Sequence, residues 1–330
     1  FATSSHRAEH FWFLNGGRTV GYDNEVLDEK YRDFYGPAHN IHKINNLHNL
    51  LKQEHGITPT KEWLEDWLVN SCELIDKYHP ETLFFDWWVM NYAFRPYMKK
   101  FLAYYYNRSV EWDKEVCVQY KSDAIMYNMG IFDRERGQLA ATSPYIWQSE
   151  TSTAYNSWSY CTTNKFKTAG KIAGTFVDVI SKNGNFVLNL GPKADGTFCE
   201  EEMQILEKLS DWTAKNKEAI WGTQPYKVFG EGKKHGNGSF NEKYNYSRKD
   251  YRFTYKTGSI YIFVLKPDRT TFKIKSLKYS GDMFAADIKN VEVLGYNQNL
   301  HYERNNRFLK IELDSPIETD MPLCFKVSID

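Results

Sequence analysis

Apolar and polar positions follow different patterns in two parts of the chain. Up to residue 224, apolar residues spaced by three or four positions alternate with short, wholly apolar runs. This pattern predicts helices alternating with buried strands in a mainly parallel α/β fold. From residue 225 onward, short alternating runs are separated by Gly, Asn and Asp turns, which is typical of an all-β sandwich. We therefore predict two domains, 1–224 and 225–330.

A short apolar run at 82–86 is the centre of the first domain. A helix predicted at 59–78 precedes it, and the run ends on Asp86, which Trp87 and Trp88 follow directly. Catalytic groups of α/β barrels lie at the carboxyl ends of parallel strands. Two indoles beside a carboxylate suit a sugar, because its C–H faces can lie on the rings while the charge reaches the anomeric carbon. The alternative is a strand-end aspartate that caps the next helix.

A second carboxylate is expected in the segment 122–160, which shows little helical periodicity. Structureless segments of this length in a compact domain are usually functional loops. Glu135 lies between two arginines, which would lower its pKa if they were close and so would not suit a resting general acid. Glu150 lies near Trp147 and has the more aromatic neighbourhood. Both glutamates are candidates.

Three further polar residues are candidates for contacts with a sugar. His6 and Glu9 precede an aromatic cluster and could bond to hydroxyl groups, although the same residues could equally begin a helix. Lys121 lies at the carboxyl end of a strand predicted at 115–121. It could contact a sugar hydroxyl or hold a carboxylate in place, or be an ordinary solvated loop lysine, which is the simplest interpretation of the residue alone.

Composition narrows the possible partners. The 42 basic and 42 acidic residues balance, which argues against nucleic acid or an anionic membrane as the main partner, and no apolar run is long enough for a membrane span. Aromatic residues make up 16% of the chain, which suits carbohydrate recognition as well as core packing. The five scattered cysteines predict neither a disulfide framework nor a metal site, and His39, His42 and His48 lie on different faces of a predicted helix.

Several stretches together resemble the α-L-fucosidases of glycoside hydrolase family 29. They are SSHRAEHFWF, LFFDWW, DRERG followed by PYIWQSETS and NSWSY, NGNFVLNLGPKADG, WTAKNKEAIWGT, and DYRFTY followed by SIYIFVL. The resemblance covers nearly the whole chain and implies a (β/α)8-like, TIM-type barrel followed by a C-terminal β-sandwich. Strands and a histidine-rich motif that open the family's barrel are not found, so we expect a barrel incomplete at its N-terminus and weak or no turnover by this chain alone.

The resemblance also implies a retaining exo-glycosidase acting on terminal α-L-fucose of oligosaccharides or glycoconjugates. Asp86 matches the nucleophile and Glu135 the acid/base, with Glu150 as the alternative. The residues matching the sugar pocket are His6, Glu9, Trp87, Trp88, Lys121 and Trp147. No metal or cofactor is implied, and the family's habit favours a secreted, periplasmic or lysosomal location. The alternatives are a related glycosidase of different specificity and a carbohydrate-binding protein without catalysis.

Overall fold

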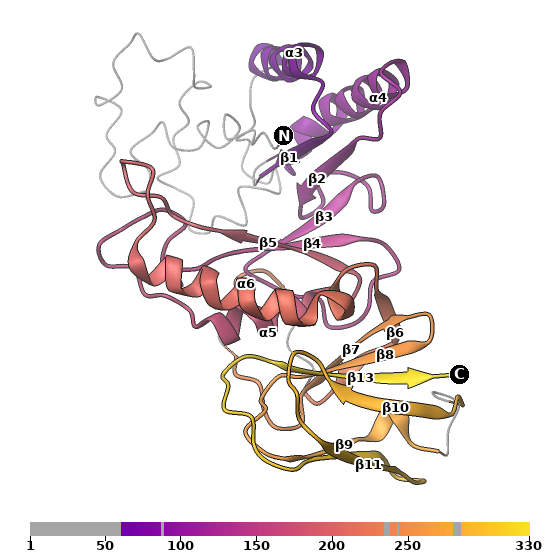
Figure 1. The fold of residues 1–330 in the computed structure, drawn as a ribbon. Coiled ribbons are helices and arrows are strands. Elements are labelled where there is room, and N and C mark those ends of the chain that lie inside the picture. The colour runs from indigo at the N-terminus through magenta and orange to yellow at the C-terminus, as the bar shows by residue number, and fades with distance from the viewer. Residues whose placement is uncertain (1–60, 87–88, 234–237, 243, 280–284) are drawn as a thin grey trace. The chain divides into compact units, whose positions relative to one another are not determined.

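The computed structural model describes residues 61–86, 89–233, 238–242, 244–279 and 285–330, and the chain divides into two compact units, Phe1–Asp133 and Arg134–Asp330 (Figure 1). The predicted residues His6, Glu9, Trp87 and Trp88 lie outside the described residues, as do His39, His42 and His48. The domain boundary expected at residue 224 stays a prediction.

The first unit contains helices packed on parallel strands. Its elements are α3 (Lys61–Tyr78), β1 (Thr82–Phe85), the short 3-10 helix η3 (Tyr92–Phe94), α4 (Arg95–Glu111), β2 (Cys117–Lys121) and β3 (Ile131–Glu135), whose last two residues belong to the second unit. β1 pairs with β2, and β2 with β3, in parallel. The carboxyl ends of these strands therefore lie at one edge of the sheet.

Aromatic side chains hold the helices of the first unit on its strands. The buried ring of Trp67 meets Phe94 edge-on at 5.2 Å, and Phe85 meets Phe101 in the same way at 4.9 Å. Edge-to-face contacts of this kind add to the free energy gained from apolar burial. The Trp67 ring also packs on Phe85 at 5.7 Å, so β1 is held against both α3 and α4.

The second unit begins with another α/β region. It comprises β4 (Trp147–Ser152), α5 (Ala169–Ile180), β5 (Gly184–Asn189) and α6 (Glu200–Ile220), and β4 and β5 pair in parallel. Thr168 caps α5 by accepting a hydrogen bond from the Lys171 backbone N–H at 3.1 Å. Trp212 of α6 donates its indole N–H to the Pro322 carbonyl at 2.7 Å, which anchors this helix on the β region that follows.

The rest of the second unit consists of strands in two antiparallel sheets. Its elements are β6 (Gln224–Glu231), β7 (Tyr251–Lys256), β8 (Ser259–Val264), β9 (Thr271–Ile274), η4 (Lys275–Leu277), β10 (Ile288–Val293), β11 (Leu300–Arg304), β12 (Leu309–Leu313) and β13 (Leu323–Ile329). The sheet orders are β10-β13-β8-β7-β6 and β11-β12-β9. Phe272 and Phe325 meet at 5.1 Å in the core between them. This is the arrangement of a β-sandwich.

The predicted fold class is confirmed: parallel strands alternate with helices as in part of a (β/α) barrel, and an all-β region follows. The expectation of long loops over 122–160 was wrong, because β3 and β4 lie within that segment. Polar residues such as Asp133, Glu135 and Glu150 interrupt both strands, so no continuous apolar run marks them in the sequence.

Candidate functional site

Asp86 directly follows β1, and its carboxylate lies beside a buried lysine of the same unit. The Nζ atom of Lys121, the last residue of β2, is 3.4 Å from Asp86 Oδ1 and 3.3 Å from Asp133 Oδ2. The side chains of Lys121 and Asp133 are almost fully buried, whereas that of Asp86 is 17% exposed. Of the two carboxylates, Asp86 is therefore the one that a molecule arriving from solvent can reach.

The position of Lys121 rules out the interpretation that it is a solvated loop lysine. It ends a strand, its residue is 1% exposed, and its register partner in β3 is Asp133. Burying an ammonium group costs free energy unless opposite charges and hydrogen bonds compensate it. The two carboxylates meet that requirement, and the lysine in turn orients the carboxylate of Asp86.

The second unit brings the two candidate glutamates together. Glu135 is the last residue of β3 and Glu150 lies in the middle of β4. A carboxylate oxygen of each lies within 4.8 Å of the other. Glu135 is 8% exposed and Glu150 is half-buried, and the Arg136 backbone N–H donates to the Glu150 carbonyl at 2.8 Å. Both side chains are therefore placed for proton transfer to one small region.

Trp147 at the start of β4 lies in the protein core. Its residue is 1% exposed, its indole N–H donates to the Lys182 carbonyl at 3.0 Å, and a Cβ atom on Gly184 would lie 2.6 Å from its ring. A ring enclosed in this way offers no face to a ligand. The burial favours a packing role for Trp147 over the sugar contact suggested by the resemblance.

The guanidinium of Arg136 is committed to a neighbouring loop, not to Glu135. It donates to the carbonyls of Ala154, Tyr155 and Ser157 at 2.9–3.1 Å and stacks over the Trp158 ring with its carbon 4.4 Å from the ring centroid. Arg136 directly follows β3 with a φ angle of +46°, so the alternation of side chains along the strand ends at Glu135.

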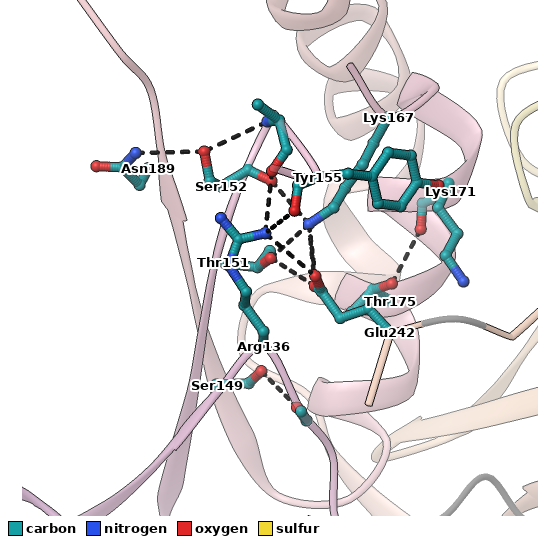
Figure 2. Close-up of polar contacts among 12 residues, drawn as sticks. Arg136, Ser149, Thr151, Ser152, Tyr155, Lys167, Lys171, Thr175, Asn189 and Glu242 are labelled. Atoms are coloured by element: carbon teal, nitrogen blue, oxygen red, sulfur yellow. Dashed lines mark hydrogen bonds and ion pairs between the residues drawn. The ribbon is translucent and has the colours of Figure 1, made fainter. Parts of the chain in front are cut away.

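Figure 2 shows a buried ionic cluster beside this arginine, formed by residues that the sequence did not mark. Lys167 Nζ donates to both oxygens of Glu242 at 3.0 and 2.9 Å, and Glu242 also lies 3.6 Å from Arg136 Nη1. Thr151 of β4 contributes its hydroxyl, which bonds to Glu242 and accepts from Lys167. Burial lowers the pKa of Lys167, and the nearby charge of Glu242 opposes that effect.

No short pattern could have revealed this cluster. Glu242 lies 75 residues from Lys167 and 91 from Thr151 in the sequence. Each of the three has an unremarkable local context, and only the return of the chain after β6 brings them together.

Within the described residues, no helix has the length and apolar character needed to cross a bilayer.

Comparison with known proteins places the chain among glycosidases. The family model described as alpha-L-fucosidase matches residues 15–218. An alpha-L-fucosidase of Branchiostoma floridae is 24% identical over 248 residues, which cover 68% of this chain and 54% of that protein. A tissue alpha-L-fucosidase of Rattus norvegicus is 25% identical over 204 residues, which cover 60% and 44%. The chain thus spans about half the length of the curated relatives it matches.

Solved structures agree on the fold. The structure of the Thermotoga maritima alpha-fucosidase in complex with fucose matches with a TM-score of 0.61 at 23% identity, and the match covers 81% of this chain and 57% of that one. At this level of identity the match is evidence for the fold alone.

Proposed function

The chain belongs to the alpha-L-fucosidase family, and from this premise we propose that it takes part in removing terminal α-L-fucose from fucosylated oligosaccharides or glycoconjugates with retention of configuration. The observation that carries the proposal is the carboxylate of Asp86, which lies at the carboxyl end of a parallel strand, partly open to solvent and paired with Lys121 at 3.4 Å. Such a carboxylate suits attack on an anomeric carbon.

In the proposed reaction, an oxygen of Asp86 attacks C1 of the fucose as the bond from C1 to the leaving oxygen breaks. Glu135 gives its proton to that oxygen, and an ester between Asp86 and fucose remains. Glu135 then takes a proton from a water molecule, whose oxygen attacks C1 and displaces Asp86. Fucose leaves with its original configuration, and both carboxyl groups return to their starting states.

Glu150 is the alternative acid/base. Its carboxylate approaches that of Glu135 to within 4.8 Å, so a modest change in substrate position would exchange the two roles. Family resemblance favours Glu135, and its place at the end of β3 is consistent with that choice.

The test of the nucleophile is hydrolysis of an aryl α-L-fucoside. We expect Asp86→Ala to lower kcat by at least about 10³-fold, because it removes the atom that forms the covalent intermediate. The matched control is Asp123→Ala in the same unit, an exposed aspartate paired with Arg95 at the surface, which should retain whatever activity the unsubstituted chain has. Equal activity of Asp86→Ala and the control would overturn the assignment of Asp86.

The restoration of activity by added azide identifies which glutamate is the acid/base. Azide needs no deprotonation to attack the ester, so it should restore turnover of Glu135→Ala and yield an α-fucosyl azide. Glu150→Ala is the matched comparison: if azide restores that variant and not Glu135→Ala, the two roles are exchanged. A β-fucosyl azide from Asp86→Ala would independently identify the nucleophile, since direct displacement inverts C1.

A carbohydrate-binding protein without catalysis is the second candidate function. It predicts fucose binding, measured by calorimetry, that survives Asp86→Asn, with no hydrolysis before or after the change. Aryl galactosides and xylosides assayed beside the fucoside separate a related glycosidase from the proposed one.

As for many glycosidases of this family, we propose a secreted, periplasmic or lysosomal location, which cell fractionation would test.

A further inference from the structure

The β-sandwich of the second unit contains a cavity of about 500 Å³ that is lined by residues of both its sheets. The walls come from the end of β6, the turn that leads into β7, and the segment 269–276 around β9 and η4. Hydrogen bonds join these walls. The Ser276 backbone N–H donates to the Glu231 carboxylate at 2.6 Å, and Arg269 Nη2 donates to the Tyr251 hydroxyl at the same distance. The sandwich cavity is therefore held in shape by the fold.

Positive charge dominates the lining of the sandwich cavity. Among the described residues that form it, five are cationic and only Glu231 is anionic. The cations are Arg248, Lys249, Arg269, Lys273 and Lys275. Positive charges still outnumber negative ones when the neighbouring Asp250 and Asp268 are counted with Glu231. Because basic and acidic residues balance over the whole chain, this excess is local, and a cleft lined by one sign of charge concentrates ions of the opposite sign.

The cations of the cavity are available to a ligand in two ways. Lys249, Lys273 and Lys275 are exposed. Arg269 is held more firmly, because its Nη2 bonds to the Arg248 carbonyl and the Tyr251 hydroxyl. Its Nε is buried and has no hydrogen-bond partner among the described residues. A fold seldom leaves a buried donor unpaired, and a bound anion is one arrangement that accounts for such a group.

The size and chemistry of the lining narrow the class of ligand. A volume of about 500 Å³ is typical of small-ligand sites and exceeds what one inorganic anion needs. Thr271 and Ser276 add hydroxyl groups that can bond to those of a ligand. Tyr251 is the one aromatic residue of the described lining and is 3% exposed, so it offers no ring on which a nucleic-acid base could stack. No described lining residue has an aliphatic side chain that would take up a lipid tail.

We propose that the sandwich cavity binds an anionic saccharide, one that carries sulfate ester or uronate groups. In this arrangement the charged oxygens lie against Arg269 and the three exposed lysines, and sugar hydroxyls lie against Thr271 and Ser276. The inference goes beyond the proposed function, because binding here uses none of the carboxylates that the reaction needs. It gives the sandwich a role of its own, which is to attach the chain to acidic glycans.

The test measures binding of a heparin oligosaccharide, which is heavily sulfated, by isothermal titration calorimetry at about 50 and 200 mM NaCl. Lys273→Ala combined with Lys275→Ala removes two exposed cations of the cavity. We expect Kd to rise at least about tenfold at the lower salt concentration, and the dependence on salt to become shallower, because fewer ionic contacts form.

The matched control is Lys227→Ala combined with Lys256→Ala. It removes the same charge from exposed positions of β6 and β7 that do not line the cavity, and it should leave Kd unchanged. An equal loss of affinity in the two double variants, or none in either, would overturn the proposal, because attraction would then not depend on the cavity.

Other probes separate the possible ligands. A galacturonate oligosaccharide carries carboxylates alone, so comparing it with the heparin oligosaccharide shows which anionic group the cavity takes. If inorganic sulfate binds as tightly as either oligosaccharide, or if duplex DNA of equal charge binds more tightly than both, the saccharide assignment is wrong. Asp86→Ala lacks the proposed nucleophile, so unchanged binding by this variant supports the saccharide site whether or not the wild type hydrolyses fucosides.

Discussion

Replacing Asp178 with asparagine tests how the second unit is held together. Asp178 of α5 is fully buried, and each of its oxygens bonds to a buried cation: Oδ2 to Lys182 at 2.6 Å and Oδ1 to Arg252 of β7 at 2.5 Å. Both cations also lie over the ring of Phe229. This cluster ties the helix of the α/β region to β7 of the sandwich.

The cost of Asp178→Asn follows from the two cations left behind. Removing one partner of a buried ion pair typically destabilises a protein by about 3–5 kcal/mol, because an uncompensated charge remains out of water. Here two charges remain, and the new amide NH₂ group faces a cation, from which it cannot accept a hydrogen bond. We therefore expect about 4 kcal/mol, or nearly a thousandfold change in the ratio of folded to unfolded protein.

The assay is urea unfolding followed by tryptophan fluorescence at pH 7. The matched control is Asp268→Asn, which removes the same charge from a surface pair with Arg248, where Asp268 is 37% exposed, and should cost less than about 1 kcal/mol. Asp178→Asn combined with Lys182→Met should recover part of the loss, because one orphaned cation disappears. A loss of under 1 kcal/mol for Asp178→Asn, equal to the control, would refute the reasoning.

Regular spacing made most of the fold predictable. The apolar positions of α3 recur at helical intervals, and the helix predicted at 59–78 covers the observed Lys61–Tyr78. β1 is a short run dominated by apolar residues after Pro80, and its predicted bounds, 82–86, differ from the observed Thr82–Phe85 by one residue. In these elements, local preference and tertiary packing favour the same residues, so the sequence alone is sufficient to predict where they lie.

Prediction failed where side chains serve something other than the core. β3 and β4 carry Asp133, Glu135 and Glu150 at positions where a structural strand would have apolar residues. β11 failed for the opposite reason: it is mostly exposed, so no buried face imposes an alternating pattern. Polar residues at the candidate site and exposure at the sheet edge both remove the apolar signal on which strand prediction depends.

The candidate site shows the same division between local and long-range information. Asp86 could be predicted as a candidate because its strand, its position at the strand end and its charge are all contiguous in the sequence. The role of Lys121 could not be decided, since its neighbour Asp133 lies in a different strand and their approach depends on strand register. The same holds for Glu242 and Lys167, whose pairing requires the sandwich strands to return the chain to the α/β region.

Two further variants test steric and electrostatic features of α5. Gly170→Ala should destabilise the protein by about 2 kcal/mol in urea unfolding, although glycine to alanine usually stabilises a helix, because the new Cβ would lie 2.1 Å from the Asp320 carbonyl oxygen; a gain in stability would contradict this. For Lys171, burial lowers the pKa from 10.5 to about 8. Between pH 8 and 10.5 the unfolded chain therefore binds more protons at Lys171 than the folded chain, so stability rises with pH in that window. Lys171→Met removes this dependence, and the stability of the wild type relative to the variant should increase by about 1 kcal/mol from pH 7 to 9.5, after allowance for the partial exposure of Lys171. A difference that stays constant over this range in thermal unfolding would show that the ammonium is solvated in the folded protein.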